Sequence, residues 1–131
     1  MNMGARQYAV NSYKFGVVAE VEGASPHRLI QMLYEGGLQK IAVAKGAIQR
    51  KDIAAKGDNI GKAIAIIGGL RASLDLSQGE IAVNLGRLYD YMERRLLEAN
   101  LKSDAEILDE VSGLLREVKT AWDAIGTTVP A

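Results

Sequence analysis

The side chains that could carry out chemistry are few in this sequence of 131 residues, and they do not form a site. The single histidine, His27, follows Ser25-Pro26 at an expected helix start. The residue three before it is Ala24 and not the glutamate of a Glu-x-x-His pair, which excludes a carboxylate-bridged di-iron bundle. We interpret His27 as a surface histidine. The alternative is a histidine phosphotransfer four-helix bundle in which His27 carries the phosphoryl group.

Two further patterns resemble sites without meeting their requirements. The segment Gly57-Asp58-Asn59-Ile60-Gly61-Lys62 has three residues between its glycines where a phosphate-binding loop has four, and it lies within a helical period. The carboxylates at positions 106, 109 and 110 share one polar helix face, which favours a solvated helix start. With no cysteine there is no thiolate nucleophile or thiolate metal ligand. We therefore predict a protein that is not an enzyme and has no catalytic residue, cofactor or metal site.

The composition excludes other classes of protein. Sixteen basic and sixteen acidic residues give a formal charge of zero, which argues against binding of nucleic acid. No apolar run approaches the roughly 18 to 20 residues of a membrane span, and the N-terminus lacks the pattern of a secretory signal. Together with the absence of cysteine, these features indicate a cytoplasmic protein that does not insert into membranes.

Four segments of apolar residues spaced three and four apart predict four helices of about 20 to 25 residues. Helix starts are indicated by a serine before a proline, by an aspartate, and by two pairs with the spacing of a capping box. The expected N-caps are Ser25, Asp52, Ser77 and Ser103. Helices of similar length with short connections predict an all-α fold, an antiparallel up-and-down four-helix bundle.

Three regions follow from this pattern: an N-terminal cap segment over residues 1–24, the bundle over residues 25–126, and a C-terminal tail over residues 127–131. Three of the seven aromatic residues lie in the first region, namely Tyr8, Tyr13 and Phe15. Because disordered tails are poor in aromatic residues, we expect this segment to pack against the bundle. The residues alone leave open whether it completes the core permanently or is displaced.

The sequence from about Tyr13 to Trp122 resembles the FliS-type flagellar export chaperones. The resemblance rests on the order and spacing of several short pieces: Ala24-Ser25-Pro26-His27-Arg28-Leu29-Ile30, Met32-Leu33-Tyr34-Glu35-Gly36, Leu70-Arg71-Ala72-Ser73-Leu74-Asp75, Leu88-Tyr89-Asp90-Tyr91-Met92, Leu96-Leu97-Glu98-Ala99-Asn100 and Ala121-Trp122. Gly68-Gly69 departs from the family, which usually has polar or acidic residues there.

The resemblance implies an antiparallel four-helix bundle that binds the disordered C-terminal segment of flagellin. Such chaperones prevent premature polymerisation in the cytoplasm and support delivery to the export gate of the flagellar type III secretion apparatus. In this family the N-terminal segment can lie over part of the hydrophobic binding surface, which favours a displaceable cap that includes Tyr8, Tyr13 and Phe15.

The second and third predicted helices carry wider apolar arcs than one contact seam needs, which predicts a groove. The predicted groove residues come from these two helices and from the first. These residues, in a mixture of core and contact roles, are Ile30, Leu33, Tyr34, Ile67, Leu70, Leu74, Leu85, Leu88, Tyr89 and Met92. Nine of the 14 glycines fall within the expected helices, at a summed cost of roughly 9 kcal/mol against alanine. We interpret them as shallow places where a client chain can approach helices that depend on packing for stability.

Overall fold

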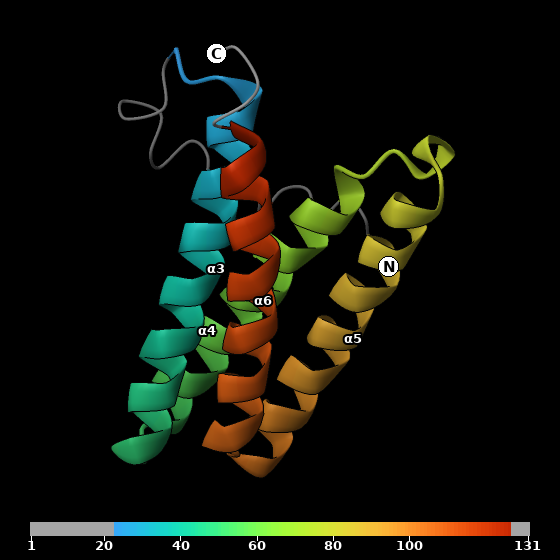
Figure 1. The fold of residues 1–131 in the computed structure, drawn as a ribbon. Coiled ribbons are helices and arrows are strands. Elements are labelled where there is room, and N and C mark those ends of the chain that lie inside the picture. The colour runs from blue at the N-terminus through green and yellow to red at the C-terminus, as the bar shows by residue number, and fades with distance from the viewer. Residues whose placement is uncertain (1–22, 127–131) are drawn as a thin grey trace.

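The computed structural model describes residues 23–126, which form an up-and-down bundle of four helices (Figure 1). The elements are α3 (Pro26–Gln49), α4 (Ile53–Ala72), the short 3-10 helix η1 (Leu76–Gln78), α5 (Glu80–Lys102) and α6 (Ala105–Gly126). Each helix packs against its neighbour in the chain, and α6 returns to pack against α3. The predicted all-α four-helix bundle is therefore confirmed. The expected cap segment and C-terminal tail lie outside the described residues.

The starts of α3 and α4 follow the predicted signals. The Ser25 hydroxyl accepts a hydrogen bond from the backbone N–H of Arg28 at 3.1 Å, and Pro26 occupies the first helical position. The Asp52 carboxylate accepts one from the backbone N–H of Ala55, also at 3.1 Å. Each cap satisfies one of the N–H groups that a helix start leaves without an intrahelical partner.

The predicted cap of α5 at Ser77 is wrong. Ser77 lies within η1, and its backbone N–H donates to the Asp75 carboxylate at 3.0 Å. Asp75 is thus the N-cap of η1. The helix α5 then begins at Glu80 after Gly79, whose φ of 105° favours glycine, and no side chain caps it. Ser77, which the capping-box spacing assigned to the start of α5, therefore belongs to the preceding turn η1.

The predicted cap of α6 at Ser103 is also wrong, by one residue. Ser103 ends α5 in the left-handed conformation, with φ 51° and ψ 48°. The Asp104 carboxylate instead accepts from the backbone N–H of Glu106 at 2.9 Å. A serine that already terminates one helix cannot adopt the extended conformation of an N-cap for the next.

The core is apolar and unevenly distributed along the bundle. Its largest fully buried side chains are Ile41, Ile60, Ile67, Leu70, Tyr89, Met92, Leu96, Leu108, Val111 and Leu115. All the buried residues of α6 come before position 116, and α5 has none between Ala82 and Tyr89. Figure 1 shows the cause, because α5 leans away from α6 towards the end where α5 starts and α6 finishes. Within the described range, no helix is both long and apolar enough to cross a bilayer.

Candidate binding groove between α5 and α6

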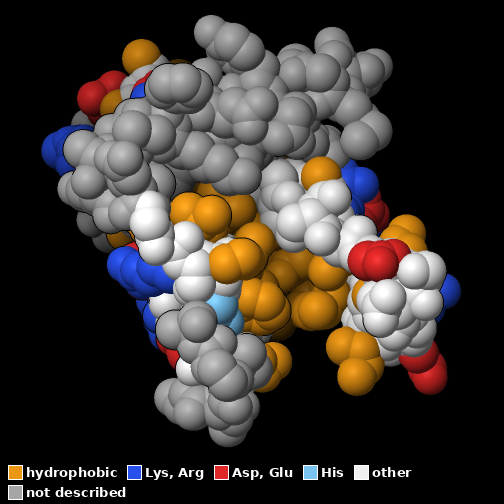
Figure 2. Space-filling view, turned by 90° about the horizontal axis from the view of Figure 1, so that it is seen from above, with side chains coloured by type: hydrophobic (Ala, Val, Ile, Leu, Met, Phe, Trp, Pro, Cys, Tyr) orange, Lys and Arg blue, Asp and Glu red, His pale blue; other side chains and the backbone are white. Residues whose placement is uncertain are grey.

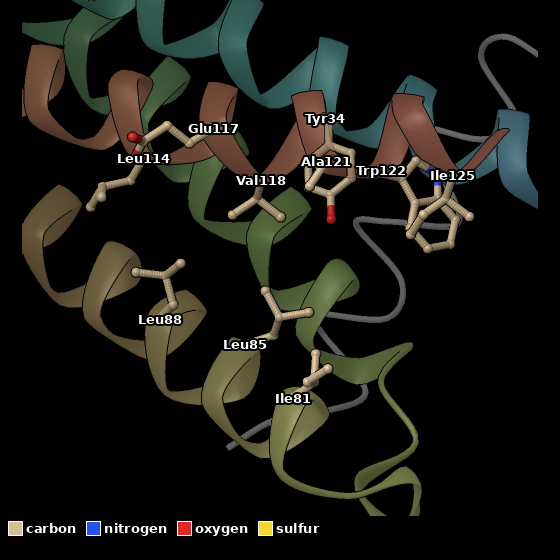
Figure 3. Close-up of a pocket in the computed structure, with 10 residues that line it drawn as sticks. All are labelled: Tyr34, Ile81, Leu85, Leu88, Leu114, Glu117, Val118, Ala121, Trp122 and Ile125. Atoms are coloured by element: carbon tan, nitrogen blue, oxygen red, sulfur yellow. The ribbon is translucent and has the colours of Figure 1, made fainter. Parts of the chain in front are cut away.

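A groove of about 410 Å³ opens where α5 and α6 diverge (Figure 3). Its walls are almost entirely apolar, apart from one carboxylate and one phenol hydroxyl. The lining residues are Tyr34, Ile81, Leu85, Leu88, Leu114, Glu117, Val118, Ala121, Trp122 and Ile125. In Figure 2, which looks down on this end of the bundle, hydrophobic side chains gather in a hollow of the described surface.

Helical spacing explains how these side chains come to face one another. On α5, Ile81, Leu85 and Leu88 follow one another at four and three residues, so they share one face. On α6, Leu114, Val118 and Ile125 likewise share a face (Figure 3). In a closely packed bundle the two stripes would meet, but here Ile81 and Ile125 stay 79% and 48% exposed. The chain therefore leaves apolar surface in water, which is typical of a surface that receives a partner.

The Tyr34 hydroxyl, which lies at the floor of the groove, pairs with the hydroxyl of Tyr89 in the core behind it. The Tyr34 and Tyr89 oxygens lie 2.6 Å apart, and the two side chains are 3% and 1% exposed. Burial raises the pKa of each phenol above its ordinary value, because a phenolate would lose its hydration there. Both groups are therefore neutral hydrogen-bonding groups at physiological pH. Figure 3 shows the Tyr34 hydroxyl projecting from α3 into the space between α5 and α6.

Trp122, which lines the groove, also makes a contact between α6 and α3. The rings of His27 and Trp122 stack with centroids 4.7 Å apart, and the indole N–H donates to the His27 carbonyl at 3.0 Å. The His27 Nε2 atom is buried, and the ring fills the space that a Cβ at Gly126 would need. We interpreted His27 as a surface histidine, but the structure places it half-buried, with its ring packed in this contact. The burial of Nε2 argues against phosphotransfer through that nitrogen, because a phosphoryl donor protein has to reach it.

The structure divides the ten residues that we predicted for a groove into three groups. Tyr34, Leu85 and Leu88 line the groove. Leu33, Ile67, Leu70, Tyr89 and Met92 are buried in the core. Ile30 and Leu74 are partly buried and pack against the core. The predicted cap residues Tyr8, Tyr13 and Phe15 lie outside the described residues.

Sequence reasoning missed the α6 wall of the groove. The apolar residues Leu114, Val118 and Ile125 of α6 line the groove, but none of them is among the ten predicted groove residues. Periodicity identifies an inward face without saying whether that face meets a neighbour. Ile81 of α5 was missed for the same reason. The glycine hypothesis also fails for this groove, since none of the residues that line it is a glycine.

The other polar patterns are structural. The segment 57–62 lies within α4 and forms no loop. Asp109 pairs with Lys45 at 2.8 Å, and Glu110 pairs with Arg95 at 2.8 Å. Among residues 23–126, no three histidine or acidic side chains gather as metal ligands would.

A second hollow lies on another face of α5 and is more polar than the groove. Its lining residues are Arg71, Leu76, Val83, Gly86, Arg87, Asp90 and Arg94. Arg71 pairs with Glu93 at 2.9 Å, and Arg94 pairs with Asp90 at 3.1 Å. Two of its three arginines are thus already engaged in ion pairs, whereas the groove between α5 and α6 presents a nearly continuous apolar surface.

Comparisons with known proteins agree with one another. The family model described as "Flagellar protein FliS" matches residues 9–129. The chain is 54% identical to the flagellar secretion chaperone FliSB of Pseudomonas aeruginosa, over 90% of this chain and 98% of that protein. It is 46% identical to the flagellar secretion chaperone FliS of Salmonella typhimurium, over 93% of this chain and 89% of that protein. The corresponding protein of Bacillus subtilis is 40% identical, over 78% and 76% of the two chains.

Proposed function

Because the chain belongs to the FliS family of flagellar proteins, we propose that it is a cytoplasmic chaperone whose groove between α5 and α6 holds the disordered C-terminal segment of flagellin. While bound, the segment cannot enter the packing of a filament, so flagellin does not polymerise prematurely. The complex then carries its client to the export gate of the flagellar secretion apparatus. The protein performs this role by binding alone, without catalysis or a cofactor.

The observation that carries this proposal is the pair of opposed apolar stripes that the bundle leaves unfilled at one end. A helical client segment could present an apolar face to both stripes at once, which is how amphipathic helices bind grooves. Ordering the client costs conformational entropy, so the complex stays releasable despite a large contact surface. A releasable complex suits a chaperone that must surrender its client for export.

Titration of the full chain with a peptide of the flagellin C-terminal segment tests the proposal. Binding should bring a negative heat-capacity change and a gain of helicity, measured by calorimetry at several temperatures and by circular dichroism. Absence of binding at micromolar concentration would contradict the proposed function.

The groove itself is tested by removing its exposed apolar rim. Ile81 and Ile125 are 79% and 48% exposed and lie outside the core cluster, so the double variant I81S/I125S should fold normally. We expect it to bind the flagellin peptide roughly tenfold more weakly, since two apolar contacts are lost. The matched control is L97S/L101S, which alters two exposed leucines of α5 that do not line the groove. Equal weakening by both pairs would mean that the client does not bind in this groove.

We further propose that residues 1–24 form the cap that occupies the client surface when flagellin is absent, with Tyr8, Tyr13 and Phe15 as its contacts. Deleting residues 1–16 removes a competitor, so the binding-competent fraction rises and the flagellin peptide should bind more tightly. Calorimetry on the truncated and full chains measures the difference. Unchanged affinity, or loss of folding, would indicate that the segment is a permanent part of the fold.

A further inference from the structure

The groove contains one hydroxyl in an otherwise apolar floor, and its hydrogen bonding is incomplete. Tyr34 and Tyr89 share a single contact, with their oxygens 2.6 Å apart. Two hydroxyls carry two protons, and one hydrogen bond between them uses only one. Among the described residues, neither hydroxyl has another hydrogen-bond partner. One of the two hydroxyl protons therefore has no acceptor among the described residues.

Burial decides which of the two phenols holds this proton. Tyr89 is 1% exposed and does not line the groove, so an unpaired proton on its hydroxyl would be stranded in the core. Tyr34 lines the groove, and its hydroxyl projects into it (Figure 3). A stranded donor in the interior costs free energy that a donor facing the groove avoids. The geometry allows either oxygen to donate. Donation by Tyr89 to the Tyr34 oxygen is the arrangement that leaves the spare proton facing the groove and not the core.

We propose that the Tyr34 hydroxyl donates a hydrogen bond to an oxygen of the bound polypeptide, so that the groove selects a client carrying an acceptor at that point. The inference rests on the proposed function and adds a specificity to it. A client that covers the hydroxyl with methyl groups leaves the donor unpaired, whereas an oxygen of the client accepts its proton.

The acceptor can come from two parts of the client. One source is a side-chain oxygen of asparagine, glutamine, serine, threonine or a carboxylate. The other is a main-chain carbonyl where the client helix ends or bends, because the last carbonyls of a helix lack intrahelical partners. Either source makes recognition depend on register along the groove, which apolar contacts alone specify weakly.

The direction of the hydrogen bond is tested on the protein alone. The variant Y89F removes the donor to Tyr34, so its urea midpoint should fall below that of the native chain. The variant Y34F should fall further, because it strands the Tyr89 hydroxyl in the core. The double variant Y34F/Y89F removes both hydroxyls and should be more stable than Y34F. A midpoint of Y89F equal to or above that of the native chain would show that the spare proton was stranded on Tyr89, and would overturn the inference.

Binding of the flagellin C-terminal peptide tests the recognition itself. The double variant Y34F/Y89F should bind about five- to tenfold more weakly than the native chain, the loss expected for one hydrogen bond. The control Y91F removes a phenol hydroxyl of α5 that bonds to Glu110 outside the groove lining, and it should bind with native affinity. If the native chain binds and the double variant binds equally well, the inference fails while the proposed function stands. If the native chain does not bind, the proposed function itself fails.

Changes in the peptide identify the acceptor. Side-chain oxygens are removed one at a time by near-isosteric replacement, such as asparagine by leucine or threonine by valine, and main-chain carbonyls are weakened by ester linkages. One position should lose about fivefold against the native chain and nothing against Y34F/Y89F. An effect of a side-chain replacement assigns the first source, and an effect of an ester assigns the second. Absence of any such coupled position would overturn the inference.

Discussion

Among single residues, Lys56 has an unusual position, because it is a lysine only 7% exposed. Its ammonium group lies where α5 ends, donating to the Asn100 carbonyl at 2.9 Å and to the Ser103 hydroxyl at 2.7 Å. Within residues 23–126 no carboxylate forms an ion pair with it. The negative end of the α5 dipole and the unpaired carbonyls of its last turn therefore compensate the buried charge.

Replacing this lysine should destabilise the bundle. The variant K56M keeps the length of the side chain but loses two charge-assisted hydrogen bonds, so we expect the free energy of unfolding to fall by about 1–3 kcal/mol. The control K62M removes an exposed lysine of the same helix whose ion pair with Asp58 is local. It should change stability by less than about 0.5 kcal/mol. Equal urea midpoints for the two variants would contradict this role of Lys56.

A second prediction at this scale concerns acid. Hydrogen bonds from Tyr91 and Arg95 hold the pKa of Glu110 below its ordinary value of 4.5. A carboxyl whose pKa is lowered by folding stabilises the native state above its unfolded pKa, and this stability is lost as the pH falls through the folded pKa. Between pH 5 and pH 3, E110Q should therefore lose less stability than the native chain. Urea midpoints across this range measure it, with E117Q on the same helix as the control.

At the scale of elements, the four helix starts show which N-caps can be predicted from nearby residues alone. Ser25 and Asp52 were predicted correctly because each is the one capping side chain at a clear change of pattern. The predictions of Ser77 and Ser103 as N-caps were wrong, because a neighbouring aspartate accepts the capping hydrogen bond in each case. Ser77 lies within the turn η1, and Ser103 ends α5. Capping spacing is local, whereas the choice between two nearby caps depends on where the previous element stops.

The helix glycines give a prediction for the elements themselves. A Cβ at Gly61 would meet no atom within 4 Å, so G61A should stabilise the protein by about 1 kcal/mol through helix propensity. A Cβ at Gly37 would lie 3.1 Å from Cδ2 of Leu115, a side chain that is fully buried and cannot move aside. We expect G37A to be destabilising despite the same gain in propensity. Thermal unfolding of the two variants compares them, and stabilisation by both would mean that α3 and α6 are not tightly packed at Gly37.

At the scale of the whole molecule, the bundle has a closed end and an open end. At the closed end, Glu110 pairs with Arg95 across α5 and α6, and buried residues fill the space between the helices. At the open end the same two helices diverge around the groove (Figure 1). Periodicity predicted four helices and their inward faces, but the angle between α5 and α6 depends on packing among residues far apart in the sequence. The bundle could therefore be predicted from the sequence, and the groove only in part.

This division predicts uneven protection of the backbone. Amide hydrogens at the closed end, in residues 92–99 and 107–115, should exchange more slowly than those of residues 80–88 and 118–126 around the groove, because opening there disrupts fewer buried contacts. Hydrogen exchange followed by mass spectrometry measures both regions. Adding the flagellin peptide should slow exchange mainly around the groove. Protection gained chiefly at the closed end would contradict the proposed binding surface.

The stacked indole at the end of the groove makes occupancy optically visible. Trp122 is the chain's only tryptophan, and it both lines the groove and stacks on His27. Its fluorescence therefore reports one location, without contributions from other indoles. A client that displaces water from the groove should shift the emission to shorter wavelength, while a ligand on the far side of α5 should leave it unchanged. The native chain thus carries its own unlabelled reporter for following capture and release in real time.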